Sequence, residues 1–232
     1  LVGSEMCIRD SPYTILEDED EKFANVVEKA VKYCKENRQP YGLIAPKGVM
    51  AANDKPNNVD CTYPMSREEA MEVILNNMPG DTIYSATTGR ATRELFFLRE
   101  KRGETKAHDF LNVGSMGHAS SVALGIALEK TERKVVALDG DSACMMHMGA
   151  MTMVSKLDAP NFMHVVLNNG SHESVGGQPS AGHKVDFTKI AEACDYATVG
   201  HPVTTEVELV EALEVLRDCG KASFIDLSLI HI

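Results

Sequence analysis

Several features that often reveal a function are absent from this chain of 232 residues. No apolar run approaches the roughly 20 residues that a membrane-spanning helix needs, which argues against a membrane protein. Lysine and arginine form no cluster with interleaved aromatic side chains, and the formal net charge at pH 7 is -11. Because nucleic acid is itself strongly negative, this charge balance argues against a nucleic-acid partner.

The chain also lacks the cysteine patterns of zinc sites and disulfide frameworks. Its six cysteines are scattered, and no two form a Cys-x-x-Cys pair. The N-terminal residues have no charged segment followed by an apolar one, so they do not resemble a signal peptide. We therefore expect a cytoplasmic protein with reduced thiols.

Both ends of the chain differ in character from the sequence between them. Residues 1–11 ("LVGSEMCIRDS") and residues 227–232 ("LSLIHI") resemble translated sequencing-adapter read-through. We interpret both segments as artefacts and the remainder as a fragment of a longer protein. A frayed tail at each end is the alternative.

Periodicity and composition divide the remainder into two α/β parts. Residues 12–50 contain a predicted amphipathic helix at 19–36 and a short strand at 41–46, which suggests the last elements of a first domain. The polar, turn-rich residues 51–63 are typical of a linker. A second domain is then expected over residues 64–226.

Strands and helices alternate through the second domain. Continuous apolar strands at 135–138 and 164–167 suit a parallel sheet that is covered on both faces. Capping boxes at Ser66 and Thr205 predict the starts of two helices. Further strands are expected at 82–87 and 223–227, and helices at 66–78, 92–101, 120–130, 187–196 and 206–218. The alternation predicts an α/β fold with a doubly wound, mostly parallel sheet.

The stretch "LDGDSA" ends one of these strands and carries the first candidate ligand. Gly140 permits a tight turn, and the N–H groups of a Met-rich helix expected from Ser142 would face a phosphate. A carboxylate at Asp141 would repel phosphate unless a cation lay between them. We therefore expect a hard, oxygen-liganded ion such as Mg²⁺. The methionines of this helix are expected in the core, with His147 as a buried partner.

The next strand end, "VVLNNGS", supplies further oxygen ligands. The side-chain oxygen of Asn169 and the backbone carbonyl of Ser171 would complete a shell beside Asp141 without adding charge. Ligands in such a sheet bind beyond the carboxyl ends of its strands, so these groups should lie on one side. Each alone would more often be a turn or a cap, but together they favour a site for a metal ion and a phosphate.

This combination resembles the diphosphate motif of thiamine-diphosphate-dependent enzymes, which usually reads Gly-Asp-Gly and ends in Asn-Asn. Ser142 replaces the commoner second glycine and is still small enough for the backbone to approach the diphosphate. The resemblance implies thiamine diphosphate and Mg²⁺ as cofactors. Asp141, Asn169 and the Ser171 carbonyl would be the metal ligands, and Gly140 and Ser142 would face the diphosphate.

A second element of that family is resembled by "GSMG", residues 114–117. By this resemblance Gly114 would offer a carbonyl to the aminopyrimidine ring, with Ser115 beside it. Met116 would be the apolar wedge beneath the bent cofactor. Thr87 and Thr88, after an earlier strand, are further candidates for contact with the aminopyrimidine.

Within that superfamily, residues 12–226 most resemble decarboxylases of phosphonopyruvate, with sulfopyruvate decarboxylases as the alternative. The continuation "GGQPS" favours the phosphonate. The resemblance implies release of CO₂ from a 2-keto acid by a homo-oligomer, a dimer or larger, with active sites between subunits. His118 and His172 are candidate catalytic residues, and Arg90 and Arg93 are candidate partners for an anionic head group.

The family's proton relay begins with a glutamate from a pyrimidine-binding domain. The resemblance implies that residues 12–50 are the last part of that domain and that the glutamate precedes them, so we expect the chain alone to be inactive. A non-catalytic phosphate- or nucleotide-binding module is a competing hypothesis. It would call for a Gly-x-Gly-x-x-Gly turn, and none follows either candidate strand.

Overall fold

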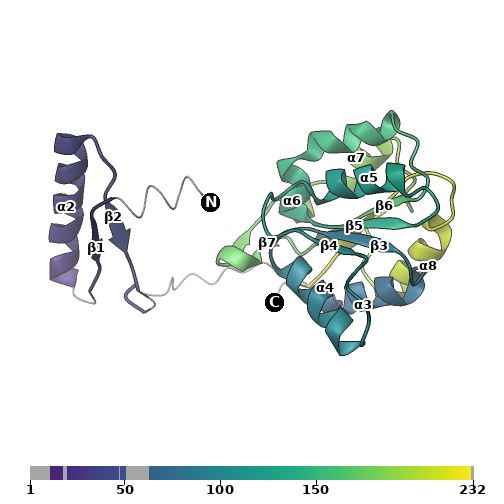
Figure 1. Ribbon diagram of the computed structural model, residues 1–232, viewed down its shortest axis with the longest axis horizontal. Coiled ribbons are helices and arrows are strands. Elements are labelled where there is room, and N and C mark those ends of the chain that lie inside the picture. Colours follow the sequence, from purple (N-terminus) through teal and green to yellow (C-terminus); the bar gives the residue numbers. More distant parts are fainter. Residues whose placement is uncertain (1–10, 18–19, 47, 51–62, 231–232) are drawn as a thin grey trace. The chain divides into compact units, whose positions relative to one another are not determined.

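The computed structural model describes residues 11–17, 20–46, 48–50 and 63–230. Its contacts divide the chain into two compact units, Leu1–Pro56 and Asn57–Ile232 (Figure 1). Almost all of the predicted linker lies outside the described residues. In the part of the chain that is described, no helix is both long and apolar enough to cross a membrane.

The first unit contains two short strands and one long helix. Strand β1 (Tyr13–Ile15) pairs in parallel with β2 (Gly42–Ile44), and helix α2 (Asp20–Asn37) connects them. The helix and the second strand match the predicted elements at 19–36 and 41–46, whereas β1 was not predicted. Its three residues carry no periodic signal long enough to be recognised.

The second unit is built on a five-stranded parallel sheet. Its strands are β3 (Ile83–Ala86), β4 (Asp109–Leu111), β5 (Val135–Gly140), β6 (Phe162–Asn168) and β9 (Ser223–Ser228). Their order is β4-β3-β5-β6-β9, and every pairing in this sheet is parallel. The predicted α/β class with a parallel sheet is therefore confirmed.

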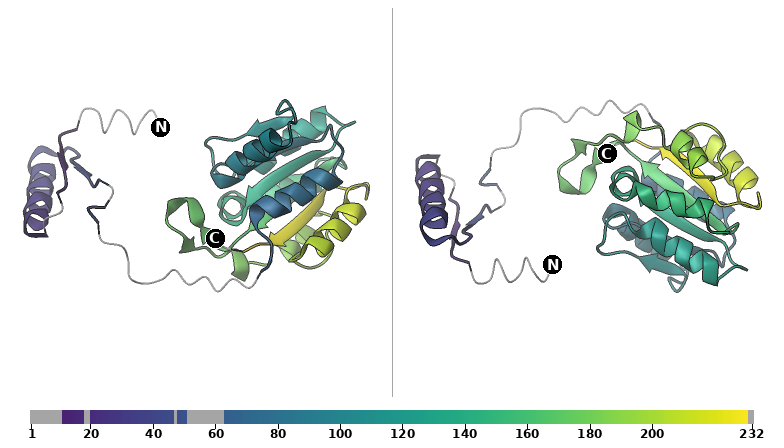
Figure 2. Two further views of the ribbon diagram at one scale, coloured as in Figure 1. Left: turned by 90° about the horizontal axis from the view of Figure 1, so that it is seen from below. Right: turned by 90° about the horizontal axis from the view of Figure 1, so that it is seen from above.

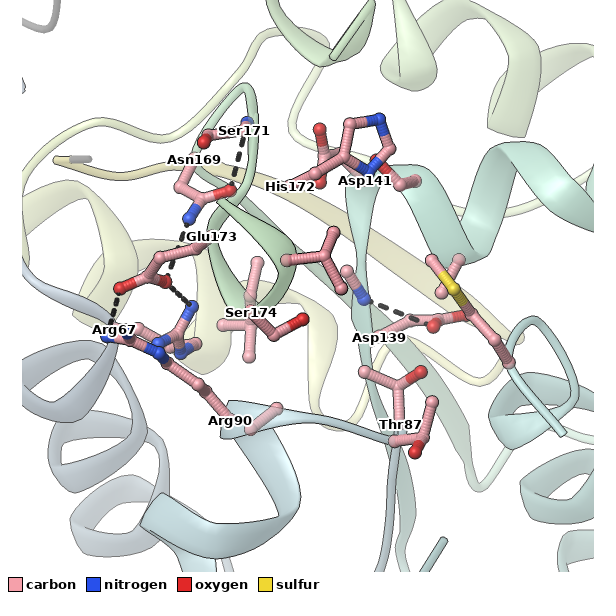
Figure 3. A pocket seen from close by; sticks show the side chains of 18 residues that line it. Arg67, Thr87, Arg90, Asp139, Asp141, Asn169, Ser171, His172, Glu173 and Ser174 are labelled. Atoms are coloured by element: carbon pink, nitrogen blue, oxygen red, sulfur yellow. Dashed lines mark hydrogen bonds and ion pairs between the residues drawn. The ribbon is translucent and has the colours of Figure 1, made fainter. Parts of the chain in front are cut away.

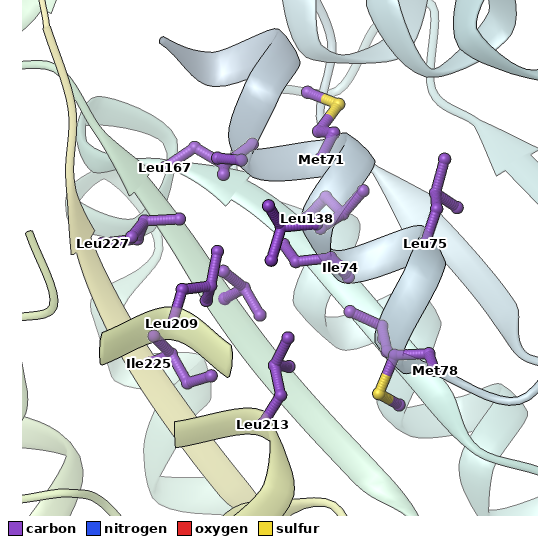
Figure 4. Close-up of a cluster of buried hydrophobic side chains, with 14 of the residues drawn as sticks. Met71, Ile74, Leu75, Met78, Leu138, Leu167, Leu209, Leu213, Ile225 and Leu227 are labelled. Carbon is purple, nitrogen blue, oxygen red and sulfur yellow. The ribbon is translucent and has the colours of Figure 1, made fainter. Parts of the chain in front are cut away.

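Helices cover both faces of this sheet (Figures 1 and 2). One face packs against α3 (Arg67–Asn77), α4 (Arg90–Lys101) and α8 (Glu206–Leu216). The other packs against α5 (Ala119–Glu129) and α7 (Phe187–Ala193). Figure 4 shows the first core, where Met71 and Ile74 of α3 face Leu138 of the sheet. Because both faces are buried, the central strands consist almost entirely of apolar residues.

The predicted capping boxes are present at both helix starts. The Ser66 side chain accepts from the backbone N–H of Glu69, whose carboxylate accepts from the Ser66 backbone N–H at 2.8 Å. Thr205 and Glu208 form the same arrangement at the start of α8. These reciprocal bonds satisfy N–H groups that have no partner within the helix, which explains why both helices begin where the sequence predicts.

The Met-rich segment after β5 differs from the prediction. It forms a short helix, α6 (Asp141–Met146), followed by a separate 3₁₀ segment, η1 (Met148–Ser155). The break falls at His147, which is exposed rather than buried; its ring lies 4.2 Å from that of His118. The prediction of one continuous helix with a buried histidine was wrong. The His147 ring packs against Gly117, where an added Cβ would lie 2.8 Å from Nδ1.

The last strand extends beyond Asp226. Leu227 pairs with Leu167 in the sheet, and Leu229 is completely buried. The backbone N–H of Leu229 donates to the Asn168 carbonyl at 2.8 Å. The first residues of the segment 227–232 are therefore packed against the strand that carries the Asn-Asn motif.

The strand order creates a switch point between β3 and β5. From β3 the chain passes to β4 on one side and then returns to β5 on the other, so the connections diverge at this place. Loops that leave diverging connections open a crevice at the carboxyl ends of the strands, where doubly wound proteins bind ligands. A hairpin of β7 (Ser171–His172) and β8 (Gln178–Pro179), with the 3₁₀ turns η2 (Glu173–Val175) and η3 (Gly182–Lys184), follows β6 on the same side.

Candidate functional site

A cavity lies at this edge of the sheet, and its walls come from several strand ends (Figure 3). Thr87 and Thr88 follow β3, and Met116 follows β4. The end of β5 contributes residues 139–143, and the segment after β6 contributes Asn169 and residues 171–175. Arg67 of α3 and Arg90 of α4 complete the lining on one side. All of these residues belong to the second unit.

The two aspartates at the end of β5 have different environments. Asp139 is completely buried; its Oδ2 lies 3.3 Å from His164 Nε2, and its Oδ1 accepts from the Gly140 N–H at 3.1 Å. Asp141 is 3% exposed and lines the cavity, with Oδ2 accepting from the Ser180 hydroxyl. Both carboxylates line the cavity, but both oxygens of Asp139 have partners in the sheet, so Asp141 is the better candidate to bind a ligand.

The two asparagines at the end of β6 also have different environments. The Asn168 amide donates to the Gly182 carbonyl at 3.1 Å and to Asp226 at 3.2 Å, so it joins core segments together. Asn169 lines the cavity, 5% exposed, and its Oδ1 accepts from the Ser171 N–H at 3.2 Å. Asn169 and Ser171 therefore share a wall of the same cavity as Asp141, as the sequence predicts.

Two glycines allow the chain to close around these groups. Gly170 has a φ of 64° and makes the turn between Asn169 and Ser171, a conformation that favours glycine. Gly182 packs so closely that an added Cβ would collide with the Asp141 carboxylate and the Asn168 amide oxygen. The loop after the hairpin thus packs directly against the Asp141 side chain.

Two hydroxyl groups in the cavity wall are buried without partners. Neither Thr87 Oγ1 nor Ser142 Oγ has a hydrogen-bond partner among the residues that the structure describes. A buried hydroxyl without a partner is costly, and native proteins usually satisfy such groups. Both donors line the cavity that contains Asp141, so an oxygen-rich ligand bound there could accept from them. This observation fits a phosphate-bearing cofactor.

The structure brings together most, but not all, of the other predicted site residues. Met116 and His172 line the cavity with Thr87 and Thr88. Gly114, Ser115 and His118 are exposed and are not part of its lining. Arg93 is also exposed and away from the lining, whereas Arg90 belongs to it. The roles of Gly114, Ser115 and His118 therefore remain predictions.

Sequence reasoning missed an ionic network on one wall of the cavity. Glu173 accepts from Arg67 Nη1 at 2.8 Å and from Arg90 Nη1 at 2.5 Å. Arg67 also makes a two-pronged pair with Glu94, with both N···O distances 2.6 Å. Burial would lower the pKa of Arg67, but the two carboxylates outweigh burial and raise it. No local pattern could have linked Arg67 to Glu173, because they lie 106 positions apart.

The acidic groups behind the site include one with a strongly shifted pKa. Burial raises the pKa of Asp226 to about 6, although the hydrogen bond from Asn168 opposes the shift, and the charges of Asp186 and Asp141 add to it. Burial likewise raises the pKa of the Cys144 thiol, which is therefore not a reactive thiolate.

The oxygen groups suit a hard cation better than a transition metal. Among the described residues, no group of three or more histidine, cysteine, aspartate or glutamate side chains could hold a metal ion. The cavity instead offers one carboxylate, one amide and the backbone around Ser171. Such a set suits Mg²⁺, which takes few protein ligands and shares the rest of its shell with phosphate and water. Because α6 has only six residues, a helix dipole contributes less to anion binding than the sequence suggests.

Comparison with known proteins gives the family directly. Residues 87–227, more than half of the chain, match the model of the thiamine pyrophosphate enzyme C-terminal TPP-binding domain. A phosphonopyruvate decarboxylase from Streptomyces viridochromogenes is 36% identical over 193 residues, which are 75% of this chain and 46% of that protein. The sulfopyruvate decarboxylase subunit beta of Methanocaldococcus jannaschii is 29% identical over 138 residues, which are 59% of this chain and 70% of that protein.

Solved structures support the same fold. A thiamine diphosphate-dependent 4-hydroxybenzoylformate decarboxylase from Rhodococcus jostii RHA1 aligns with a TM-score of 0.61 at 14% identity, covering 96% of this chain and 44% of that one. A putative thiamin diphosphate-dependent enzyme from Mycobacterium smegmatis aligns with a TM-score of 0.62 at 18% identity, covering 95% and 44%. This chain spans less than half the length of these proteins and of the Streptomyces decarboxylase.

The cavity at the switch point and the family match coincide in the sequence. The matched residues 87–227 begin at Thr87 in the cavity wall and include the Asp141 and Asn169 strand ends. Arg67 alone of the lining precedes them. The chain therefore belongs to the thiamine pyrophosphate enzymes and contains their C-terminal TPP-binding domain.

Proposed function

We propose that this chain is the cofactor-binding part of a thiamine-diphosphate-dependent 2-keto acid decarboxylase. The observation that carries the proposal is one cavity that joins Asp141, Asn169 and Ser171 with the unpartnered hydroxyls of Thr87 and Ser142. Asp141, Asn169 and Ser171 offer oxygens to a cation. The hydroxyls of Thr87 and Ser142 can donate hydrogen bonds to an anion. A metal diphosphate requires both kinds of group in one place.

Mg²⁺ is the cation that this arrangement favours. The Asp141 carboxylate would repel a diphosphate at short range, and an intervening divalent ion reverses that interaction. Asn169 adds an oxygen without adding charge, so the site does not become too negative for the cofactor. Thr87 and Ser142 would then donate to the phosphate oxygens and regain the hydrogen bonds they lack.

When bound, thiamine diphosphate supplies the nucleophile and the electron sink for decarboxylation. The chain's own residues hold it and exclude water. Met116, which follows β4, lines the cavity and would offer an apolar contact to the cofactor. His172 lies at the cavity wall, partly exposed, where it could donate a hydrogen bond to a substrate carboxylate.

Phosphonopyruvate is the substrate that we favour, with phosphonoacetaldehyde and CO₂ as products. The support is the 36% identity to a phosphonopyruvate decarboxylase and the segment "GGQPS" in the hairpin beside the cavity. Arg90 is a candidate contact for the phosphonate, because its side chain is 47% exposed and lines the cavity.

Sulfopyruvate is the second candidate, because the relatives named sulfopyruvate decarboxylase subunit beta are covered over 70% and 77% of their length. Both substrates carry an anionic head group on a three-carbon keto acid. Decarboxylation assays of the complete enzyme with each substrate decide between them.

We further propose that the catalytic glutamate lies in a pyrimidine-binding domain of which residues 12–50 are the last part. The active site would then join two domain types across subunits of a homo-oligomer, a dimer or larger. On this proposal the isolated chain binds the cofactor but does not turn over substrate at rates comparable to a full-length relative.

Titration calorimetry tests the proposal. The chain should bind thiamine diphosphate with Mg²⁺, weakly or not at all when EDTA removes the metal, and should not bind NAD. Asp141→Asn should lose the Mg²⁺-dependent binding of the cofactor, because the variant removes the charge of the proposed metal ligand while keeping the size of the side chain. Binding of NAD, or tight cofactor binding by Asp141→Asn, would contradict the proposal and favour a nucleotide- or phosphate-binding module.

A further inference from the structure

Glu173 occupies a central place in the cavity wall that no assigned role explains. Its side chain is 7% exposed, and its carboxylate accepts three hydrogen bonds from three different elements (Figure 3). Oε1 accepts from Arg90, and Oε2 accepts from Arg67 and from the Nδ2 of Asn169 at 3.2 Å. The residue thus connects two arginines to the amide that is proposed to hold Mg²⁺.

The contacts of Asn169 fix which end of its amide meets Glu173 and which end meets Ser171. A carboxamide has a donor end and an acceptor end of nearly equal size, and only the oxygen can bind a cation. A carboxylate can only accept, so Glu173 must face the NH₂ end. The Ser171 N–H can only donate, and it meets the oxygen end at 3.2 Å. One orientation of Asn169 satisfies both neighbours, and the opposite orientation satisfies neither.

Glu173 is not suited to be a ligand itself. Both of its oxygens already accept from guanidinium groups, and the two arginines offset its negative charge. Arg67 of α3 is held in turn by Glu94 of α4, so the Glu173 carboxylate is bound by an arginine that is itself fixed between two helices. A group of this kind orients a ligand without competing for the cation.

We propose that Glu173 is a positioning residue that fixes the Asn169 carboxamide with its oxygen toward the metal. This inference rests on the proposed function, in which Asn169 is a ligand of Mg²⁺. It assigns the ionic network of α3, α4 and the hairpin to the preparation of the metal site rather than to substrate binding alone.

The first test compares Glu173→Gln with Glu94→Gln in the full 232-residue chain. Both variants remove one carboxylate from the same Arg67 network, but only the first touches Asn169. Calorimetric titration of Mg²⁺ at saturating thiamine diphosphate should show an affinity about tenfold to a hundredfold lower for Glu173→Gln, the usual effect of removing such a partner. Glu94→Gln should lower the affinity for Mg²⁺ much less, because Arg67 and Arg90 still hold Glu173 and Glu173 still contacts Asn169. Equal affinities for the two variants would overturn the proposal.

The second test needs no ligand. It measures stability, so a loss of stability in a variant is its readout rather than an obstacle. Asn169→Asp turns the NH₂ that faces Glu173 into an oxygen, so two carboxylates repel and the melting temperature of the cofactor-free chain should fall. Adding Glu173→Gln supplies a hydrogen-bond donor and should restore part of the lost melting temperature. If the double variant instead loses the sum of the two single-variant decreases, the inferred orientation is overturned. Failure of the wild-type chain to bind cofactor would contradict the proposed function instead, and this thermal cycle would still decide the orientation.

Discussion

The polar residues at the ends of β5 and β6 fall into two groups with opposite tasks. Asp139 and Asn168 make side-chain contacts with core residues, although Asp139 also borders the cavity, while Asp141 and Asn169 line the cavity. In each pair the first residue belongs to the strand and is held by the sheet, whereas the second follows the last residue of the strand. Removing the first should damage the fold, and removing the second should damage only binding.

Asp226 gives a prediction at the residue scale, because burial raises its pKa to about 6. A raised pKa means that the folded protein favours the protonated carboxyl. This contribution to stability is complete below the unfolded value near 4 and is lost as the pH rises through about 6. Asp226→Asn keeps an oxygen for the hydrogen bond from Asn168 and never ionises.

Relative to the wild type, Asp226→Asn should gain about 2 kcal/mol in free energy of unfolding between pH 4 and pH 8. Urea denaturation across that range measures the gain. Asp218→Asn is the control with the opposite sign, because Lys134 and Arg217 lower the pKa of the exposed Asp218. A gain for Asp226→Asn that does not change with pH would contradict the assigned ionisation.

The site residues differed in how far sequence could predict them. Asp141, Asn169 and Ser171 were predictable because each follows an apolar strand, and parallel strands bring those ends together. Glu173 and Arg67 were not, because their pairing depends on how α3 lies against a hairpin more than a hundred positions away in sequence. Thr87 and Met116 were predicted only through resemblance and line the cavity.

At the scale of elements, the helices that begin with a capping box were predicted most closely. The helix predicted at 66–78 spans Arg67–Asn77, and the one predicted at 206–218 spans Glu206–Leu216. The segment after β5 was predicted least well, since its apolar spacing does not distinguish an α-helix from a 3₁₀ segment. The break falls at His147, whose ring packs against Gly117, a residue distant in sequence.

The cap of α3 should make a measurable contribution to stability. Ser66→Ala removes the side chain that accepts from the Glu69 N–H and should lower the free energy of unfolding by about 1 kcal/mol. Ser155→Ala is a matched control on an exposed hydroxyl at the end of η1 and should change it by less than about 0.5 kcal/mol. Chemical denaturation of both variants measures the difference. Equal effects would show that the cap contributes nothing specific.

At the scale of the whole molecule, the fold class followed from the alternation of strands and helices. The strand order could not be predicted, because short connections allow β4 to lie on either side of β3. The two units also differ in self-sufficiency. The second has a core on each face of its sheet, whereas the described part of the first has two three-residue strands and one helix.

This difference predicts that the second unit folds and binds by itself. Every residue that lines the cavity lies in Asn57–Ile232. A chain that starts at Asn57 should therefore unfold cooperatively and bind Mg²⁺ and thiamine diphosphate with the affinity of the full chain. Calorimetry on both chains measures this. Markedly weaker binding by the shorter chain would mean that the first unit contributes to the site.

The pairing between β5 and β6 keeps one constant offset, from Val135 opposite Phe162 to Gly140 opposite Leu167. The relative height of Asp141 and Asn169 is therefore set by the sheet and not by the number of residues in the crossover between them. Natural or engineered insertions between Met146 and Asn161 should leave the two ligands aligned, whereas deleting a single residue from either strand would turn one of them toward the opposite side of the sheet. The number of residues between the two parts of the motif can therefore vary, whereas the register of each strand cannot.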